Sequence, residues 1–134
     1  INRIRSEHES THARIEHAMT LILTFSEKNP GMCRILTGDA LAGETERLRI
    51  RVAQFFERLE TQLKQMLREA EIRDDKVTSI EAGAAANLLL AFVEGRIRQY
   101  VRSEFTNKPL NNWPLQWSFL SNNLLIESTL AEQV

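Results

Sequence analysis

Apolar residues recur every three or four positions along two long segments of the chain, which predicts amphipathic helices. The first segment runs from about Thr11 to Glu27 and the second from about Glu44 to Ala70. Their apolar positions are Ala13, Ile15, Ala18, Ile22 and Phe25 in the first, and Leu48, Val52, Phe55, Leu59, Leu63, Met66 and Ala70 in the second. No stretch alternates apolar and polar residues as a half-buried strand does, so we expect an all-α domain of about five helices.

A short interrupted helix is expected between these two, in the passage SEKNPGMCRILTGDALAG. Asn29 can cap its start, and Pro30 suits the first helical position because its missing N–H would have no partner there. Gly38 and Gly43 are expected to loosen or end this helix.

A third long helix is predicted from Thr78 to about Phe105, because Thr78 and Glu81 are spaced as a capping box. It contains an uninterrupted apolar run from Leu88 to Val93, which covers more of a helix than one stripe. A helix of this kind must be buried on two sides. A final helix, predicted from about Pro114 to Ala131, also has more apolar surface than one face needs.

Two adjoining helices with surplus apolar surface predict a homodimer, in which the last two helices form an intersubunit four-helix bundle. The residues expected at that interface are Leu89, Val93, Ile97, Trp117, Leu120 and Leu124. A solitary molecule in a crystal or in sedimentation, with the regions around Leu89 and Leu124 fully covered from within, would contradict this expectation.

Composition narrows the class of protein further. The chain has 134 residues, 43% hydrophobic and 26% charged, which suits one globular domain. Its formal net charge of −1 argues against general nucleic-acid binding by this chain alone. Cys33 is the one cysteine, which excludes an internal disulfide and indicates a buried thiol in a reducing, cytoplasmic setting. No apolar stretch is long enough to span a membrane, and the chain begins at Ile1 without a signal peptide, as a piece of a longer protein would.

One motif points to catalysis, but its context argues against it. Residues 8–12 spell H-E-x-x-H, the pattern of a zinc hydrolase when it lies on a helix. Ser10 or Thr11 resembles a helix cap, which would separate His8 from His12, and His17 is off their shared face. We therefore expect no metal, no cofactor and no enzymatic activity.

Two other sets of side chains have both a structural and a functional interpretation. Arginines on two predicted helices either form solvated faces or bind an acidic peptide. They are Arg47, Arg51 and Arg58 on one helix and Arg98 and Arg102 on the other. Four apolar residues are core side chains or line a small-molecule pocket, namely Phe25, Phe55, Leu59 and Phe92.

Three passages carry a resemblance to a known family. SEKNPGMCRILTGDAL, RVAQFFERLETQLKQMLRE and LLLAFVEGRIRQYVRSEF closely resemble the C-terminal domain of nucleoid occlusion factors, which belong to the TetR family of DNA-binding regulators. The resemblance extends from about Ile1 to Pro109. It implies that residues 1–134 form an all-helical dimerisation and partner-binding domain, with residues 1–5 ending a connecting helix. The helix-turn-helix domain that binds DNA would precede this chain.

The resemblance also implies partners. Such factors bind chromosomal DNA and the C-terminal tail of the division protein FtsZ, so the protein is expected at the nucleoid. The matching tail-binding positions are Arg3, Leu21, Thr24, Lys28 and Asn29. Thr24 stands where the family has a small Gly-like residue. Lys28 replaces an Arg, which keeps the positive charge but loses the planar guanidinium that binds a carboxylate with two hydrogen bonds. The alternative within the family is a repressor that responds to a small molecule bound near Phe25, Phe55, Leu59 and Phe92.

Overall fold

The computed structural model describes residues 10–38, 46–73 and 76–127, and it is predominantly helical there. Its elements are α2 (Thr11–Lys28), α3 (Pro30–Leu36), α4 (Glu46–Arg73), β1 (Lys76–Thr78), α5 (Ala82–Arg102), α6 (Trp113–Leu124) and β2 (Leu125–Glu127). The predicted all-α class, with a short helix between two long ones, is confirmed for these residues.

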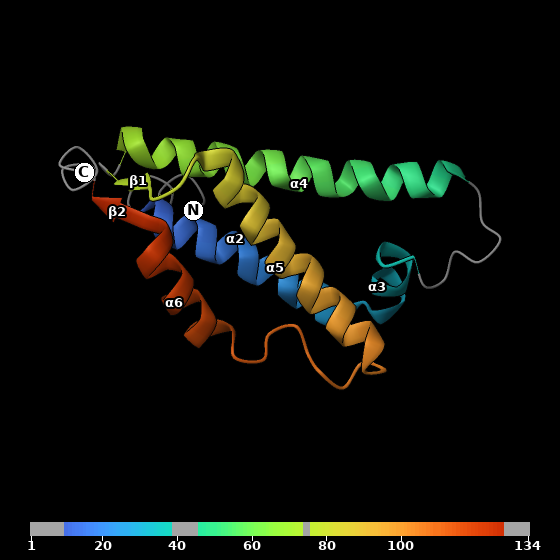
Figure 1. The fold of residues 1–134 in the computed structure, drawn as a ribbon. Helices are drawn as coiled ribbons and strands as arrows, with labels where there is room; N and C mark the ends of the chain where they lie inside the picture. Colours follow the sequence, from blue (N-terminus) through green and yellow to red (C-terminus); the bar gives the residue numbers. More distant parts are fainter. Residues whose placement is uncertain (1–9, 39–45, 74–75, 128–134) are drawn as a thin grey trace, which may run out of the picture.

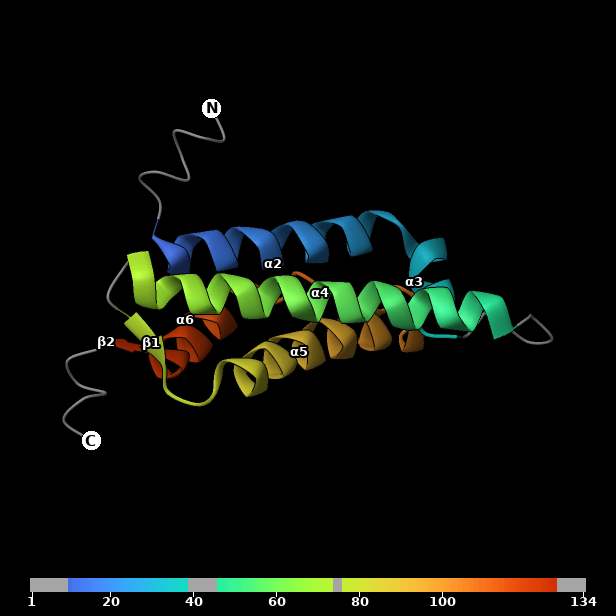
Figure 2. The ribbon, with the colours of Figure 1, turned by 90° about the horizontal axis from the view of Figure 1, so that it is seen from above.

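Three long helices, α2, α4 and α5, pack against one another around a common apolar core. Figure 2 shows α2 and α4 side by side, and Figure 1 shows α5 crossing them with α6 next to its first half. The largest side chains in this core, each at most 2% exposed, are Ile15, Met19, Leu23, Leu63, Leu67, Leu89, Val93 and Ile97. Each contributes about 1.5–3 kcal/mol through removal from water.

The ends of the first two helices follow from local chemistry, although Asn29, at the N-cap position of α3, makes no side-chain capping hydrogen bond with that helix. The Ser10 side chain accepts a hydrogen bond from the Ala13 N–H at 3.1 Å, so α2 begins at Thr11. Pro30 occupies the first turn of α3. Gly38 follows that helix with a φ of +81°, a conformation that a glycine adopts without strain.

Two short strands are present that the sequence pattern did not predict. β1 and β2 pair antiparallel, with Val77 opposite Ile126. Ser79 extends the contact, donating from its N–H to the Leu124 carbonyl at 2.8 Å and from its hydroxyl to the Asn123 carbonyl at 2.6 Å. Strands of three residues are too short for a pattern of alternation to be recognised in the sequence.

The predicted boundaries of the last two helices were wrong. Thr78 lies in β1 and does not cap α5; instead, the Glu81 carboxylate accepts hydrogen bonds from the N–H groups of Gly83 and Ala84 at 2.9 and 3.2 Å. α5 ends at Arg102, before a turn that includes Phe105.

The final helix is also shorter than predicted. α6 begins at Trp113 and stops at Leu124, because Leu125 is extended and enters β2. The remainder of the predicted helix, residues 128–131, lies outside the described residues.

Candidate partner-binding site

The corner between α2 and α3 is held by Asn29, which serves both helices. Its side-chain Nδ2 donates to the Phe25 carbonyl at 2.8 Å, and its backbone N–H donates to the Ser26 carbonyl at 3.2 Å. Its own carbonyl accepts the Cys33 N–H at 3.1 Å, which is the first hydrogen bond of α3. These bonds satisfy carbonyl groups at the end of α2 that have no helical partner.

Cys33 lies beneath this corner and is fully buried, as predicted. Its thiol donates to the Ser26 carbonyl at 3.2 Å. Burial raises the pKa of the Cys33 thiol, and the interaction with the Ser26 side chain, which lowers it, offsets only part of that rise. The thiol is therefore a structural group and not an activated nucleophile.

Two aromatic side chains fasten α2 to the C-terminal half of the domain. The Tyr100 hydroxyl of α5 donates to the Glu27 carbonyl at 2.6 Å. The Trp113 Nε1 of α6 donates to the Thr20 hydroxyl at 2.7 Å. These two bonds hold α2 along one side and at its C-terminal end, and its outer surface remains exposed.

That outer surface carries four of the five predicted partner-binding residues. Leu21, Thr24 and Lys28 follow one another at spacings of three and four, so they share one face of α2, and Asn29 ends it. Leu21 is 56% exposed, and Phe25, one turn further on, is 53% exposed. The fifth predicted residue, Arg3, lies outside the described residues.

The four residues predicted for a small-molecule pocket are not brought together. Leu59 is buried in the core, whereas Phe25 and Phe55 are exposed. Phe55 lines a hollow on α4, and Phe92 lines a separate groove against α6. The structure therefore corrects the prediction of one cavity shared by these side chains.

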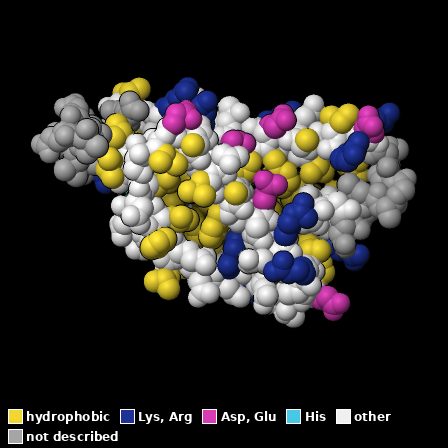
Figure 3. All heavy atoms as spheres, viewed as in Figure 1, with side chains coloured by type: hydrophobic (Ala, Val, Ile, Leu, Met, Phe, Trp, Pro, Cys, Tyr) yellow, Lys and Arg dark blue, Asp and Glu magenta, His cyan; other side chains and the backbone are white. Residues whose placement is uncertain are grey.

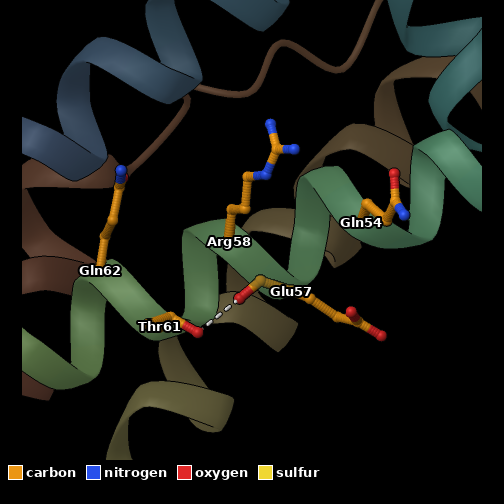
Figure 4. A pocket seen from close by; sticks show the side chains of 5 residues that line it. All are labelled: Gln54, Glu57, Arg58, Thr61 and Gln62. Carbon is orange, nitrogen blue, oxygen red and sulfur yellow. Dashed lines mark hydrogen bonds between the residues drawn. The ribbon is translucent and has the colours of Figure 1, made fainter.

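The hollow beside Phe55 continues along α4 and is polar. Its first part is lined by Arg51, Gln54, Phe55 and Arg58, and the adjoining part by Gln54, Glu57, Arg58, Thr61 and Gln62. In Figure 4, the side chains of Arg58 and Gln62 project from α4 toward the side on which α2 lies, while Glu57 points away. Sequence analysis placed Arg51 and Arg58 on one helix but had no means of placing α2 beside them.

A second exposed surface, formed by α5 and α6, is apolar. Figure 3 shows hydrophobic side chains gathered over α6 and the first half of α5. Leu115 and Phe119 are 74% and 72% exposed, and they flank a groove of about 430 Å³ shared with Phe92, Gln116 and Leu120. Leu115 and Phe119 are four residues apart, a spacing that could have identified this face from the sequence.

The residues predicted for a dimer interface lie mostly beneath this surface. Five of the six are core residues of the single chain and at most 4% exposed, namely Leu89, Val93, Ile97, Trp117 and Leu124. Leu120 is partly exposed and lines the groove. A second chain could contact Leu115 and Phe119 but not the five buried residues. Leu115 and Phe119 therefore replace those five as candidate interface residues.

The H-E-x-x-H motif extends beyond the described residues, which begin at Ser10 and so exclude His8 and Glu9. His12 lies on α2, and its ring is 5.1 Å from that of Trp117. Within residues 10–38, 46–73 and 76–127, no three His, Cys, Asp or Glu side chains are grouped as a metal ion would require. In the same ranges, none of the helices combines the length and apolar character that a membrane span needs.

Residues 9–125 match the family model of SlmA-like proteins, described as a tetracyclin repressor-like C-terminal domain. The nucleoid occlusion factor SlmA of Marinomonas sp. (strain MWYL1) is 55% identical over 126 residues, covering 94% of this chain and 64% of that protein. SlmA of Colwellia psychrerythraea is 51% identical over 123 residues, covering 92% and 62%. SlmA of Shewanella pealeana is 49% identical over 125 residues, covering 93% and 64%. The chain thus spans slightly less than two thirds of the length of these relatives.

Proposed function

Because the chain belongs to the family of SlmA-like, tetracyclin repressor-like C-terminal domains, we propose that it is the dimerisation and partner-binding domain of a nucleoid occlusion factor. DNA binding is assigned to a helix-turn-helix domain that precedes this chain in the whole protein, and the protein would act at the nucleoid. The dimer would set the distance between the two recognition helices on DNA half-sites.

We further propose that the outer face of α2 binds the C-terminal tail of FtsZ. The supporting observation is that Leu21 and Phe25 are more than half exposed, beside Lys28, on a helix whose end is hydrogen-bonded in place. An extended peptide can cover the two apolar side chains, while Lys28 attracts its acidic residues. Phe25 and Phe55 are exposed and Leu59 lies in the core, so the geometry supports a peptide and not an enclosed small molecule.

Titration of the full-length protein on its DNA with a fluorescent FtsZ tail peptide tests this assignment. Leu21→Ala and Lys28→Ala are each expected to weaken peptide binding by about tenfold, because each removes a direct contact. Lys64→Ala, the same change of charge on α4, is the matched control and should leave the affinity unchanged. Absence of peptide binding, or equal affinities for all variants, would contradict the proposal.

The apolar face of α5 and α6 is proposed as the dimer interface. Leu115 and Phe119 are too exposed and too close together to be ordinary isolated surface residues. Sedimentation of the full-length protein should show a dimer that Phe119→Glu converts to a monomer. Leu21→Glu adds the same charge at another exposed apolar site and should remain dimeric. A monomeric wild-type protein, or a dimeric Phe119→Glu variant, would refute this interface.

A further inference from the structure

An open hollow of about 410 Å³ lies where the end of α3 approaches the last turns of α5. The two helices pack against each other, and Figure 1 shows α3 beside the C-terminal half of α5. Five residues from both elements line the hollow, and none of them is acidic: Thr37, Gly38, Arg98, Val101 and Arg102. None belongs to the outer face of α2 or to the apolar groove of α6. The volume is that of a small-molecule site.

Main-chain hydrogen bonds and core packing fix both walls of this hollow. On the α3 side, the Thr37 N–H donates to the Cys33 carbonyl at 3.0 Å and the Gly38 N–H donates to the Ile35 carbonyl at 3.1 Å. No atom lies within 4 Å of the place where a side chain on Gly38 would begin, so the space above this wall is open. On the α5 side, partly buried Val101 packs against the core and supplies an apolar floor.

The two arginines of α5 stand on this wall without a partner. Arg98 and Arg102 are four positions apart, so their Cβ atoms are about 5–6 Å from each other on one face of the helix. Both are exposed, and neither makes a hydrogen bond or an ion pair with any part of the chain that the structure describes. Figure 3 shows Lys and Arg side chains gathered over the C-terminal half of α5, a local positive surface on a chain whose net charge is −1. Like charges at this spacing repel, and an anion bound by both would remove that repulsion.

We propose that this hollow binds a small organic phosphate monoester, with Arg98 and Arg102 holding the phosphoryl group and Val101 contacting the organic part. A carboxylate carries one charge and two oxygens, which a single guanidinium already satisfies. A phosphoryl group carries almost two charges near neutral pH and three acceptor oxygens, so it matches two arginines. The Thr37 hydroxyl, which donates to the Arg34 carbonyl at 3.2 Å, can rotate to become a third donor.

Titration calorimetry of the full-length protein without DNA, at pH 8, tests this site with phenyl phosphate as the probe. Phenyl sulfate is the matched ligand, because it has nearly the same shape but only one charge, and we expect it to bind at least tenfold more weakly. Arg98→Ala and Arg102→Ala should each weaken phenyl phosphate about tenfold, and Arg98→Lys should give an intermediate loss because lysine keeps the charge but not the planar donors. Arg68→Ala removes an exposed arginine from α4 and should leave the affinity unchanged.

The same titrations contain the results that would overturn the inference. Equal affinity of the wild type and both alanine variants would place any bound phosphate elsewhere in the protein. Equal affinity for phenyl sulfate would show that two arginines do not share one dianion. Equal affinity for inorganic phosphate would show that the organic part is not bound. None of these measurements uses the FtsZ peptide or the dimer, so the phosphate site stands or falls separately from the proposed function.

Discussion

The hydroxyl of Tyr100 makes one hydrogen bond whose removal tests how the partner-binding corner is held. It donates to the Glu27 carbonyl at 2.6 Å, and Tyr100 is only 4% exposed. Glu27 lies in the last turn of α2, where a carbonyl has no intrahelical N–H to accept. Tyr100→Phe removes the donor and keeps the ring, including its edge contact with Phe105 at 5.1 Å between ring centroids.

The magnitude follows from the single bond that is lost. A neutral hydrogen bond contributes about 1 kcal/mol net, and a partly buried carbonyl without a partner adds a desolvation cost. We therefore expect Tyr100→Phe to lower the free energy of unfolding by about 1–2 kcal/mol. For a domain of this size, that corresponds to a fall in melting temperature of about 4–8 °C.

Circular dichroism during thermal and urea unfolding measures this change. All variants are compared at one protein concentration, because the stability of the proposed dimer would depend on concentration. Gln99→Ala, at the exposed neighbouring position, is the control and should change the stability by less than about 0.5 kcal/mol. A loss for Tyr100→Phe no greater than that of the control would refute the reasoning, because the end of α2 would then not depend on this bond.

Three further changes test local features of the chain. Glu104 has a φ of +54°, so Glu104→Gly should relieve backbone strain and raise the melting temperature. Gln99→Gly within α5 is the control and should lower the free energy of unfolding by about 1 kcal/mol. A lower melting temperature for Glu104→Gly would show that the backbone at Glu104 is not strained. Cys33 should react slowly with iodoacetamide at pH 8 until urea unfolds the protein, because burial raises the pKa of its thiol; rapid labelling of the folded protein would exclude a buried thiol. The N–H of Gly83 lowers the pKa of Glu81, so the stabilisation is present above the ordinary carboxyl pKa of 4.5 and is lost as pH falls through the lowered value. The melting-temperature difference between wild type and Glu81→Gln should accordingly be larger at pH 7 than at pH 3, and a difference independent of pH would contradict the role of the carboxylate.

Part of the candidate site could be predicted from the sequence, and part could not. Leu21, Thr24 and Lys28 could be placed on one face from their spacing alone, because helical periodicity is a local property. Which helix packs beside α2 could not, since it depends on the alignment of two helices that the Arg14–Glu69 contact reveals. The pocket predicted from Phe25 and Phe92 failed for the same reason: shared chemistry in the sequence does not establish a shared cavity.

Local interactions were sufficient to specify the helices of the first half. The apolar period of α2 and α4, the Ser10 cap and the Pro30 start each involve residues within one or two helical turns, so the sequence by itself determined where these helices form. The buried face of α2 was not predicted correctly, since Met19 and Leu23 are buried whereas Phe25 is 53% exposed. The tertiary structure decided which side of α5 became core, burying Leu89 and leaving Leu88 47% exposed. It also ended α6 at Leu124 by pairing β2 with β1. Both outcomes depend on contacts between residues far apart in the chain, which no local pattern encodes.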